Sequence, residues 1–329
     1  MCTALSWCGK HHYFGRNLDL EYDLQEQICI TPRNYTFPLR HDPVLKPKYA
    51  MIGTAIVSRD YPLYFDATNE TGLSMAGLNF PDLAVYHPGE DNRMNIPSFA
   101  LIPWILSQCR TVSEAEHLLT GAWITNEAFS EDFPPTPLHW IVSDAQRNIV
   151  VESMADGLKI HQNDVGVLTN NPPFDFHLYH LASHRQLRPQ PSDNGFSPSL
   201  TLPPYSNGMG AIGLPGDLSS PSRFVRAAFV KENSIGGTVE QDIAQFFHIL
   251  DCVAMPRGSV ILPDGRLEIT QYSSCCDTVS GIYYYKTYDN SRVCCVDLHN
   301  TELNGTKLIC YPMLRHADFF QQNETGGPL

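Results

Sequence analysis

Hydrophobic residues recur in the first third of the chain in short, β-branched stretches that polar turns separate. These stretches predict strands at residues 4–8, 14–22, 27–32, 49–57, 64–68 and 73–78. Between the last two, Asn69-Glu-Thr-Gly72 has the composition of a hairpin turn whose glycine adopts a positive φ. Chain termini normally fray, so an apolar stretch at the very start is informative. The pattern indicates an amino terminus that is held inside a sheet.

The middle of the chain changes to a helical pattern. Helices are predicted at residues 98–109, 111–120, 221–232 and 239–255, and Thr111-Val-Ser-Glu114 has the form of a capping box. Strands return at residues 138–143, 148–153, 166–169, 282–288 and 293–297. This order predicts an α+β fold of stacked layers.

Residues 186–222 are rich in Pro, Ser, Gly and Asn. We interpret them as a long surface excursion and not as a domain linker, because apolar structure continues on both sides. We therefore expect a single domain over residues 1–329.

Composition narrows the possible functions. The chain has 329 residues, of which 43% are hydrophobic and 17% charged, as in packed globular proteins. Its formal net charge is −13 without a basic stripe, which argues against a nucleic-acid partner. We find no run of 18 apolar residues and no basic-then-apolar leader, so we expect neither a membrane span nor a secretory signal. The ten cysteines are therefore expected to be reduced thiols.

Two cysteine doublets, Cys275-Cys276 and Cys294-Cys295, lie in the last third of the chain, where we expect strands. Neighbouring strand residues point to opposite faces, so neither doublet can chelate as a Cys-x-x-Cys pair does. We expect no metal site.

Cys2 directly follows the initiator Met. If Met1 is removed, as we expect, one residue carries both a thiol and a free α-amine. The α-amine has a reference pKa of about 7.7–8.0, so near neutral pH it can accept the proton of the thiol. Nucleophile and base would then belong to the same residue. The alternative is that Cys2 is an ordinary small residue near a terminus.

Further polar residues lie where a site could use them, and each has a structural alternative. Arg16 and Asp19 are three positions apart in a strand, so their side chains would face opposite sides unless the strand bends. They could form a surface ion pair, or both could contact Cys2. Arg223 falls in the first turn of a helix, where the dipole disfavours a cation, so it needs an anionic partner unless it is solvated. Asn79 and Asn170 each follow an apolar strand. Each could be an ordinary turn residue, or its amide could donate to an oxyanion.

Nine ordered motifs resemble the choloylglycine hydrolase family over residues 1 to about 300. They are Met1-Cys-Thr-Ala4, Phe14-Gly-Arg-Asn-Leu-Asp19, Asn69-Glu-Thr-Gly-Leu73, Ala76-Gly-Leu-Asn-Phe-Pro81, Leu138-His-Trp140, Val167-Leu-Thr-Asn170, Gly213-Leu-Pro-Gly-Asp217, Ser220-Pro-Ser-Arg-Phe-Val-Arg226 and Tyr283-Tyr-Tyr-Lys-Thr-Tyr-Asp-Asn290. Within the family, Asn79 makes the chain more similar to bile salt hydrolases than to penicillin V acylases, which often have Tyr there. Lys286 departs from the family's usual Asn, and we attach no consequence to it.

The resemblance implies an N-terminal-nucleophile hydrolase with an αββα sandwich of two stacked antiparallel sheets. It implies cofactor-free cleavage of the amide that joins a bile acid to glycine or taurine. It also implies roles residue by residue: Cys2 as nucleophile, Arg16 and Asp19 beside its thiol and amine, the Asn79 backbone N–H and the Asn170 side chain as oxyanion hole, and Arg223 completing the polar cluster. Because Arg16 and Asp19 would both have to reach Cys2, we expect a bend in their strand.

The resemblance further implies an apolar steroid pocket. Its walls would be Leu20, Tyr22, Tyr64, Phe65, Phe129 and Phe133, with the last two on a loop. It also implies a homo-oligomer, commonly a tetramer, in the bacterial cytoplasm and without a membrane partner. Two other readings stay open: an acylase acting on penicillin V or on an N-acyl homoserine lactone, and a non-catalytic sterol-binding protein.

Overall fold

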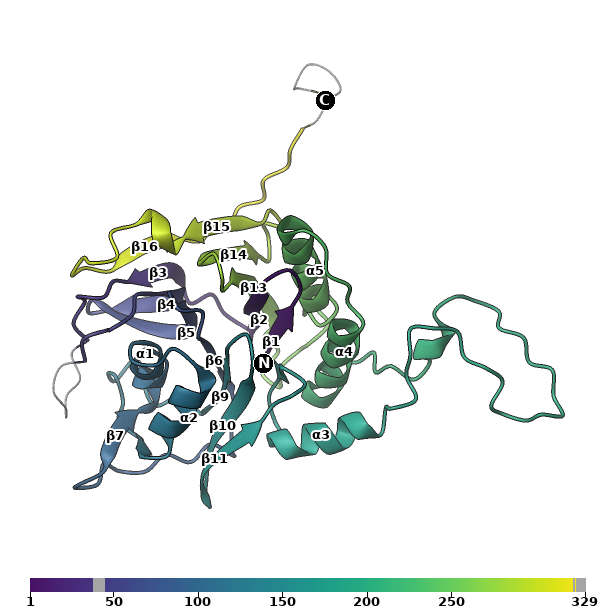
Figure 1. Cartoon of the computed structure of the whole chain (residues 1–329), viewed down its shortest axis with the longest axis horizontal. Coiled ribbons are helices and arrows are strands. Elements are labelled where there is room, and N and C mark those ends of the chain that lie inside the picture. Colours follow the sequence, from purple (N-terminus) through teal and green to yellow (C-terminus); the bar gives the residue numbers. More distant parts are fainter. Residues whose placement is uncertain (38–44, 322, 324–329) are drawn as a thin grey trace.

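The computed structural model describes residues 1–37, 45–321 and 323. Two antiparallel sheets lie face to face between helices (Figure 1). The six-stranded sheet has the order β12-β1-β2-β13-β14-β15 and the eight-stranded sheet the order β11-β10-β9-β6-β5-β4-β3-β16. The short β7 and β8 form a separate parallel pair.

The strands of the six-stranded sheet are β1 (Cys2–Cys8), β2 (His12–Leu20), β12 (Val167–Leu168), β13 (Ile269–Asp277), β14 (Ile282–Thr287) and β15 (Cys294–Asp297). The strands of the eight-stranded sheet are β3 (Gln27–Thr31), β4 (Met51–Ser58), β5 (Tyr61–Asn69), β6 (Ser74–Asn79), β9 (Leu138–Ser143), β10 (Asn148–Met154), β11 (Gly157–Gln162) and β16 (Ile309–Pro312). The separate pair is β7 (Met94–Pro97) and β8 (Ala122–Thr125). The helices are α1 (Leu101–Leu106), α2 (Val112–Leu119), α3 (Phe174–Ala182), α4 (Ser220–Glu232) and α5 (Val239–Asp251), with 3₁₀ turns at Ser98–Ala100, Met209–Ala211 and Leu298–Asn300.

Helices cover the outer face of each sheet. Helices α4 and α5 pack on the six-stranded sheet through strands that include β1, β2 and β13, whereas α1 and α2 pack on β5, β6 and β9. Alternate residues of β9 therefore belong to different hydrophobic cores. Ile141 packs in the core between the two sheets, with residues of β1 and β2. Its neighbours Trp140 and Val142 pack in the core between the eight-stranded sheet and α1. The expected α+β fold, an αββα sandwich, is confirmed.

Most predicted elements are present, with shifted ends. The helix expected at 98–109 is a 3₁₀ turn followed by the shorter α1. Thr111 caps α2 by accepting the Glu114 N–H, but the Glu114 carboxylate accepts the Arg110 N–H, so the reciprocal half of the capping box is missing. Gly72 has φ +91°, as the hairpin requires. The sequence analysis did not predict α3, β7, β8, β11, β13 or β16.

The predicted surface excursion projects from the body as a long arm between α3 and α4 (Figure 1). Its base is closed where the Arg188 N–H donates to the Gly210 carbonyl at 3.0 Å. The expected boundary at 222 is wrong, because α4 already begins at Ser220. We define the arm as residues 188–210.

No helix in the described part of the chain is long and apolar enough to span a bilayer. Within the same residues, no three His, Cys, Asp or Glu side chains come together in a group that could hold a metal ion.

Gly15 allows β2 to approach β13 closely. A Cβ on Gly15 would lie 2.0 Å from the Ser274 carbonyl oxygen, whereas a Cβ on Gly216 would have no atom within 4 Å. We predict that Gly15→Ala lowers the free energy of unfolding by about 1–3 kcal/mol or more, since the strands must separate. Gly216→Ala, the matched control, should change it by less than about 0.5 kcal/mol. Urea unfolding measures the free energy of unfolding of both variants. Equal changes in the two would contradict the close approach of β2 to β13 at Gly15.

Candidate active site

The amino terminus is fixed inside the six-stranded sheet. Strand β1 lies between β12 and β2, and Cys2, its first residue, is opposite Leu18. Cys2 is only 2% exposed. The Met1 ammonium donates to the Asp19 carbonyl at 2.8 Å and forms an ion pair with Glu268. The expectation that the terminus is held in a sheet is confirmed.

Arg16 and Asp19 reach Cys2 from opposite faces of β2. Arg16 lines a cavity between the sheets together with Leu18 and Leu20, whereas Asp19 faces the helix layer and Arg223. The expected bend in β2 is wrong, because β2 pairs in unbroken register with β1. The irregularity lies in β13, where the register shifts between Thr270 and Tyr272.

On the cavity side, Arg16 connects the two sheets. Its Nη1 donates to the carbonyls of Gly77 at 2.6 Å and Phe65 at 3.0 Å. Its Nε and Nη2 are buried without a hydrogen-bond partner. Burial opposes the charged form, but Cys2, Tyr272 and Asp66 nearby outweigh it and raise the pKa of Arg16. A guanidinium with two unused donors is therefore available to an anion in the cavity.

On the helix side, Asp19 and Arg223 form a buried pair. The distance from Arg223 Nη1 to Asp19 Oδ2 is 3.9 Å, and both side chains are fully buried. Thr270 donates its hydroxyl to Asp19 Oδ1 at 2.6 Å, while Asp19 Oδ2 has no hydrogen-bond partner. Burial raises the pKa of Asp19, and Arg223 acts in the opposite direction. The unpaired Oδ2 can accept one further donor.

Arg223 lies in the first turn of α4, as predicted, although the N-cap is Ser219 and not Ser220. Its guanidinium donates to Thr3 Oγ1 at 2.6 Å, to Asn170 Oδ1 at 2.8 Å, to the Leu218 carbonyl at 3.0 Å and to the Cys2 carbonyl. The solvated alternative is excluded, since Arg223 is fully buried. Its anionic partner within the protein is the Asp19 carboxylate, at 3.9 Å.

Asn79 is the last residue of β6, and β5 does not pair with it. Strand β5 pairs with β6 only as far as Ala76. The Phe80 N–H donates to the Pro137 carbonyl, beside β9. Since successive residues of a strand alternate between its two edges, the N–H and C=O of Asn79 point away from β9. The Asn79 N–H therefore faces the Cys2 side of the strand.

Asn170 follows β12 and joins these groups. Its Oδ1 accepts the Cys2 N–H at 2.8 Å, and its Nδ2 donates to the Asn79 carbonyl at 2.7 Å. Its own N–H donates to Ser220 Oγ at 2.8 Å. One side chain thus connects the start of β1, the end of β6 and Arg223.

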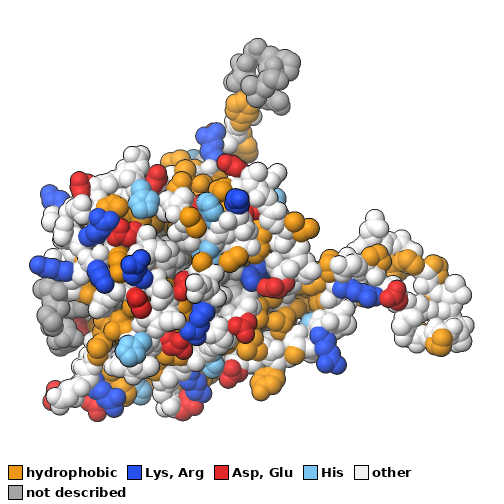
Figure 2. All heavy atoms as spheres, in the orientation of Figure 1, with side chains coloured by type: hydrophobic (Ala, Val, Ile, Leu, Met, Phe, Trp, Pro, Cys, Tyr) orange, Lys and Arg blue, Asp and Glu red, His pale blue; other side chains and the backbone are white. Residues whose placement is uncertain are grey.

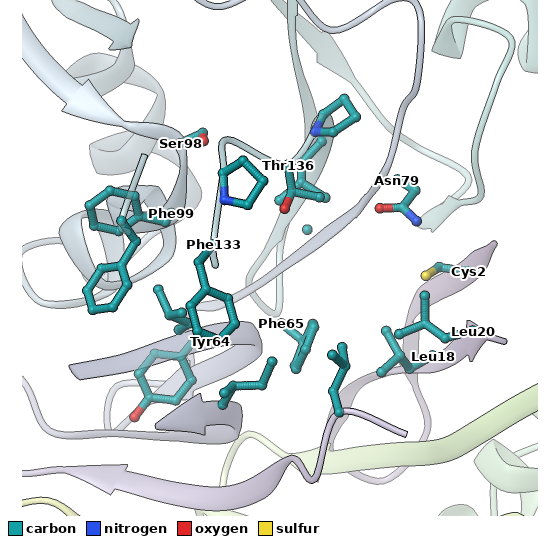
Figure 3. Close-up of a pocket in the computed structure, with 18 of the residues that line it drawn as sticks. Cys2, Leu18, Leu20, Tyr64, Phe65, Asn79, Ser98, Phe99, Phe133 and Thr136 are labelled. Carbon is teal, nitrogen blue, oxygen red and sulfur yellow. The ribbon is translucent and has the colours of Figure 1, made fainter. Parts of the chain in front are cut away.

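A cavity of about 670 Å³ opens at Cys2. All six expected pocket residues line it: Leu20, Tyr22, Tyr64, Phe65, Phe129 and Phe133. In Figure 3 the Cys2 sulfur and Asn79 lie at one end, and Phe133, Tyr64 and Phe99 lie towards the other. The Phe129 N–H donates to the Phe133 carbonyl at 3.1 Å, which closes their loop.

Sequence reasoning missed several residues of the site. Leu18 and Phe99 line the cavity, and Leu18 could have been found because it alternates with Arg16 and Leu20 along β2. Thr270 and Glu268 come from β13 and the residues before it, about 250 positions from their partners Asp19 and Met1. No local pattern in the sequence indicates such contacts.

Comparison with known proteins agrees with this geometry. The family model "Linear amide C-N hydrolases, choloylglycine hydrolase family" matches residues 2–311. A bile salt hydrolase/transferase of Lactiplantibacillus plantarum is 47% identical over 98% of this chain and 100% of its own. The C2A mutant of the conjugated bile acid hydrolase from Clostridium perfringens has a TM-score of 0.91 at 35% identity and covers 98% of this chain and 100% of its own.

A more distant structure shares the fold. Penicillin V acylase from Agrobacterium tumefaciens has a TM-score of 0.75 at 21% identity, over 94% of this chain and 91% of its own. With the matching family model and the full-length relatives, the Cys2 site and its fold establish that this chain belongs to the choloylglycine hydrolase family of linear amide C–N hydrolases.

Proposed function

We propose that this protein hydrolyses the amide bond of bile acids conjugated to glycine or taurine, with Cys2 as the nucleophile. The observation that carries the proposal is the position of Cys2 at one end of a mostly apolar cavity of about 670 Å³. A sterol is rigid and apolar, and each 100 Å² of its surface buried there contributes about 2.5 kcal/mol of binding. Its carboxamide would then lie beside the thiol. Relatives at up to 47% identity that are named bile salt hydrolases support the same substrate class.

The reaction begins with the free amine of Cys2. Once Met1 is removed, the ammonium form can donate to Asp19 Oδ2, the buried oxygen that has no hydrogen-bond partner. The neutral amine takes the proton of the thiol, and the thiolate attacks the carbonyl carbon of the amide. Arg16 lines the same cavity, and its charge would stabilise the thiolate.

The negative charge that develops on the carbonyl oxygen needs preorganised donors. We assign this role to the Asn79 N–H and to the Asn170 side-chain amide. The Cys2 N–H and the Arg223 guanidinium both donate to Asn170 Oδ1 and so hold this amide in place. The ammonium of Cys2 then protonates the leaving glycine or taurine nitrogen, and the C–N bond breaks. Water adds to the thioester and releases the bile acid with the regenerated thiol. An amine that replaced this water would give acyl transfer, as the word transferase in the relatives' names suggests for them.

We predict that the protein releases free amine from glycocholate and taurocholate, and that Cys2→Ser releases at least about 10³-fold less while staying folded. The measurement is amine release from both substrates and from penicillin V, side by side. Circular dichroism of Cys2→Ser is the control for folding.

Release from penicillin V alone would keep the mechanism and refute the substrate. No release from any of the three, with Met1 absent by intact mass, would refute the proposed function and favour the sterol-binding alternative. Release from the bile salts by Cys2→Ser at the rate of the unmodified protein would refute the role of Cys2.

We predict that protein retaining Met1 is inactive. With Met1 present, the Cys2 nitrogen is an amide, which cannot accept the proton of the thiol. Expression with an inhibitor of methionine aminopeptidase supplies a graded set of preparations, and activity should follow the fraction that has lost Met1 by intact mass. Full activity in a preparation that retains Met1 would contradict this mechanism.

We also propose that the protein assembles into a homo-oligomer, as a tetramer, through the arm. Phe196 and Tyr205 on the arm are 83% and 84% exposed, and Figure 2 shows apolar side chains along it. Apolar surface displayed on a projecting segment favours contact with another copy.

Light scattering should give a mass close to four times 36.9 kDa. The double substitution Phe196→Ser and Tyr205→Ser should lower that mass, while the exposed control Ile235→Ser should not. A mass of one chain for the unsubstituted protein would contradict the proposal.

Two further expectations stay proposals. The chain forms one domain, since β1 and β15 near opposite ends of the sequence belong to one sheet; a single urea transition is the expected result. The protein works in the bacterial cytoplasm, which the bacterial origin of its relatives supports and which cell fractionation tests.

A further inference from the structure

A buried cluster of histidines and a carboxylate lies directly behind Asn79 and Asn170. It consists of His139 on β9, Glu152 on β10 and His177 on α3, all fully buried. The mechanism above uses none of them. His139 belongs to the motif Leu138-His-Trp140, to which the sequence analysis assigned no role.

His139 contacts the neighbours of both proposed oxyanion donors. Its Nε2 is 2.9 Å from the Thr169 carbonyl oxygen, one residue before Asn170. Its ring stacks on Phe80, one residue after Asn79, with 4.3 Å between centroids and an interplanar angle of 7°. A single side chain therefore sets the spacing between the end of β6 and the segment that follows β12.

Glu152 fixes the orientation of that ring. Its Oε1 is 3.1 Å from His139 Nδ1 and accepts the Phe174 N–H at 3.0 Å. Burial opposes ionisation, but His139, hydrogen bonded to Oε1, and His161, whose Nε2 lies 3.4 Å from Oε2, outweigh it and bring the pKa of Glu152 to about 2. Carboxylate and carbonyl thus hold the ring from its two edges.

His177 holds the other end of the same segment. Its Nε2 is 2.8 Å from the Asn170 carbonyl oxygen, so this nitrogen carries the proton and donates. Its ring stacks on Phe224 with 4.9 Å between centroids, next to Arg223. Burial lowers the pKa of His177 to about 4, which keeps the ring neutral near pH 7.

We propose that His139, oriented by Glu152, and His177 are positioning residues that hold the Asn170 amide and the Asn79 N–H at the spacing that an oxyanion requires. This inference rests on the proposed function, because it concerns the donors of that reaction. The two histidines hold consecutive carbonyls, those of Thr169 and Asn170, and so fix the backbone from which the Asn170 side chain extends.

The kinetic consequence is specific. The oxyanion forms only during the reaction, so misplaced donors lower kcat while KM, set by the sterol in the cavity, changes little. Loss of one oxyanion donor costs about 10²–10³-fold in rate, and a misplaced donor about tenfold to a hundredfold. A purely structural role would lower stability and leave kcat of the folded protein unchanged.

The test compares variants that differ in one hydrogen bond. His177→Phe keeps a ring against Phe224 but removes the donor to the Asn170 carbonyl, whereas His177→Gln places an amide N–H at a similar reach. We expect His177→Phe to lower kcat on glycocholate by about tenfold to a hundredfold with KM within about twofold. His177→Gln should recover to within a few-fold of the unsubstituted protein. His139→Phe should resemble His177→Phe.

His12→Phe is the matched control. His12 is also buried, with a pKa that burial lowers to about 4, but its partners are Ser6, Ser143 and Thr278. Its loss should cost stability and leave kcat of the folded protein unchanged. If His177→Phe folds with unchanged kcat, if its effect falls on KM alone, or if His177→Gln is equally impaired, the proposal is wrong.

If the proposed function itself is wrong, the activity measurements differ from those that would overturn the positioning role. In that case the unsubstituted protein, like Cys2→Ser, releases no amine from conjugated bile salts. Crystal structures of the unsubstituted protein and of His177→Phe then test the positioning role directly. A displaced Asn170 amide relative to Asn79 supports the proposal, and an unmoved one overturns it.

Discussion

The site depends on one constraint: the first strand of the chain lies inside a sheet and not at its edge. Strand β1 is paired on both sides, with β12 at Ala4 and Leu5 and with β2 along its whole length, and the Cys2 N–H donates to Asn170 Oδ1. These contacts hold the backbone of Cys2 in place. Chain termini usually remain mobile since few contacts order them. Here the hydrogen bonds of two strands offset that loss of entropy, and the thiol and backbone nitrogen of Cys2 occupy fixed positions.

The surrounding charges follow from this position. Cys2 lies at the boundary between the cavity and the helix layer, so its environment is divided between two faces of β2. Arg16 lines the cavity, and Asp19 with Arg223 lies on the side of the helix layer. Buried charges are costly unless they are paired or hydrogen bonded, and Arg223 meets this requirement with four acceptors. Arg16 is the exception, since two of its donors remain unused beside the cavity.

A polar network behind Asn79 and Asn170 connects the two sheets. Strands β6 and β12 belong to different sheets, so no ladder of hydrogen bonds fixes their mutual distance. The Asn170 amide, which donates to Asn79, and the His139 ring, which lies between Phe80 and Thr169, fix it instead. Rotamers held by packing and by hydrogen bonds of this kind are what a preorganised site requires.

The sequence by itself determined the layered α+β class, the helices α4 and α5, the surface arm and the residue types of the site, because periodicity, capping residues and the position of Cys2 are local signals. It missed α3, since the Pro172-Pro173 that precedes it reads as a turn, and it placed a bend in β2 that does not exist. Only the tertiary structure decided that Arg16 and Asp19 serve opposite faces, that Thr270 and Glu268 join them, and that His139 lies between two strand ends. These facts depend on strand order and sheet stacking, which bring together residues that are far apart in the sequence and leave no local pattern there.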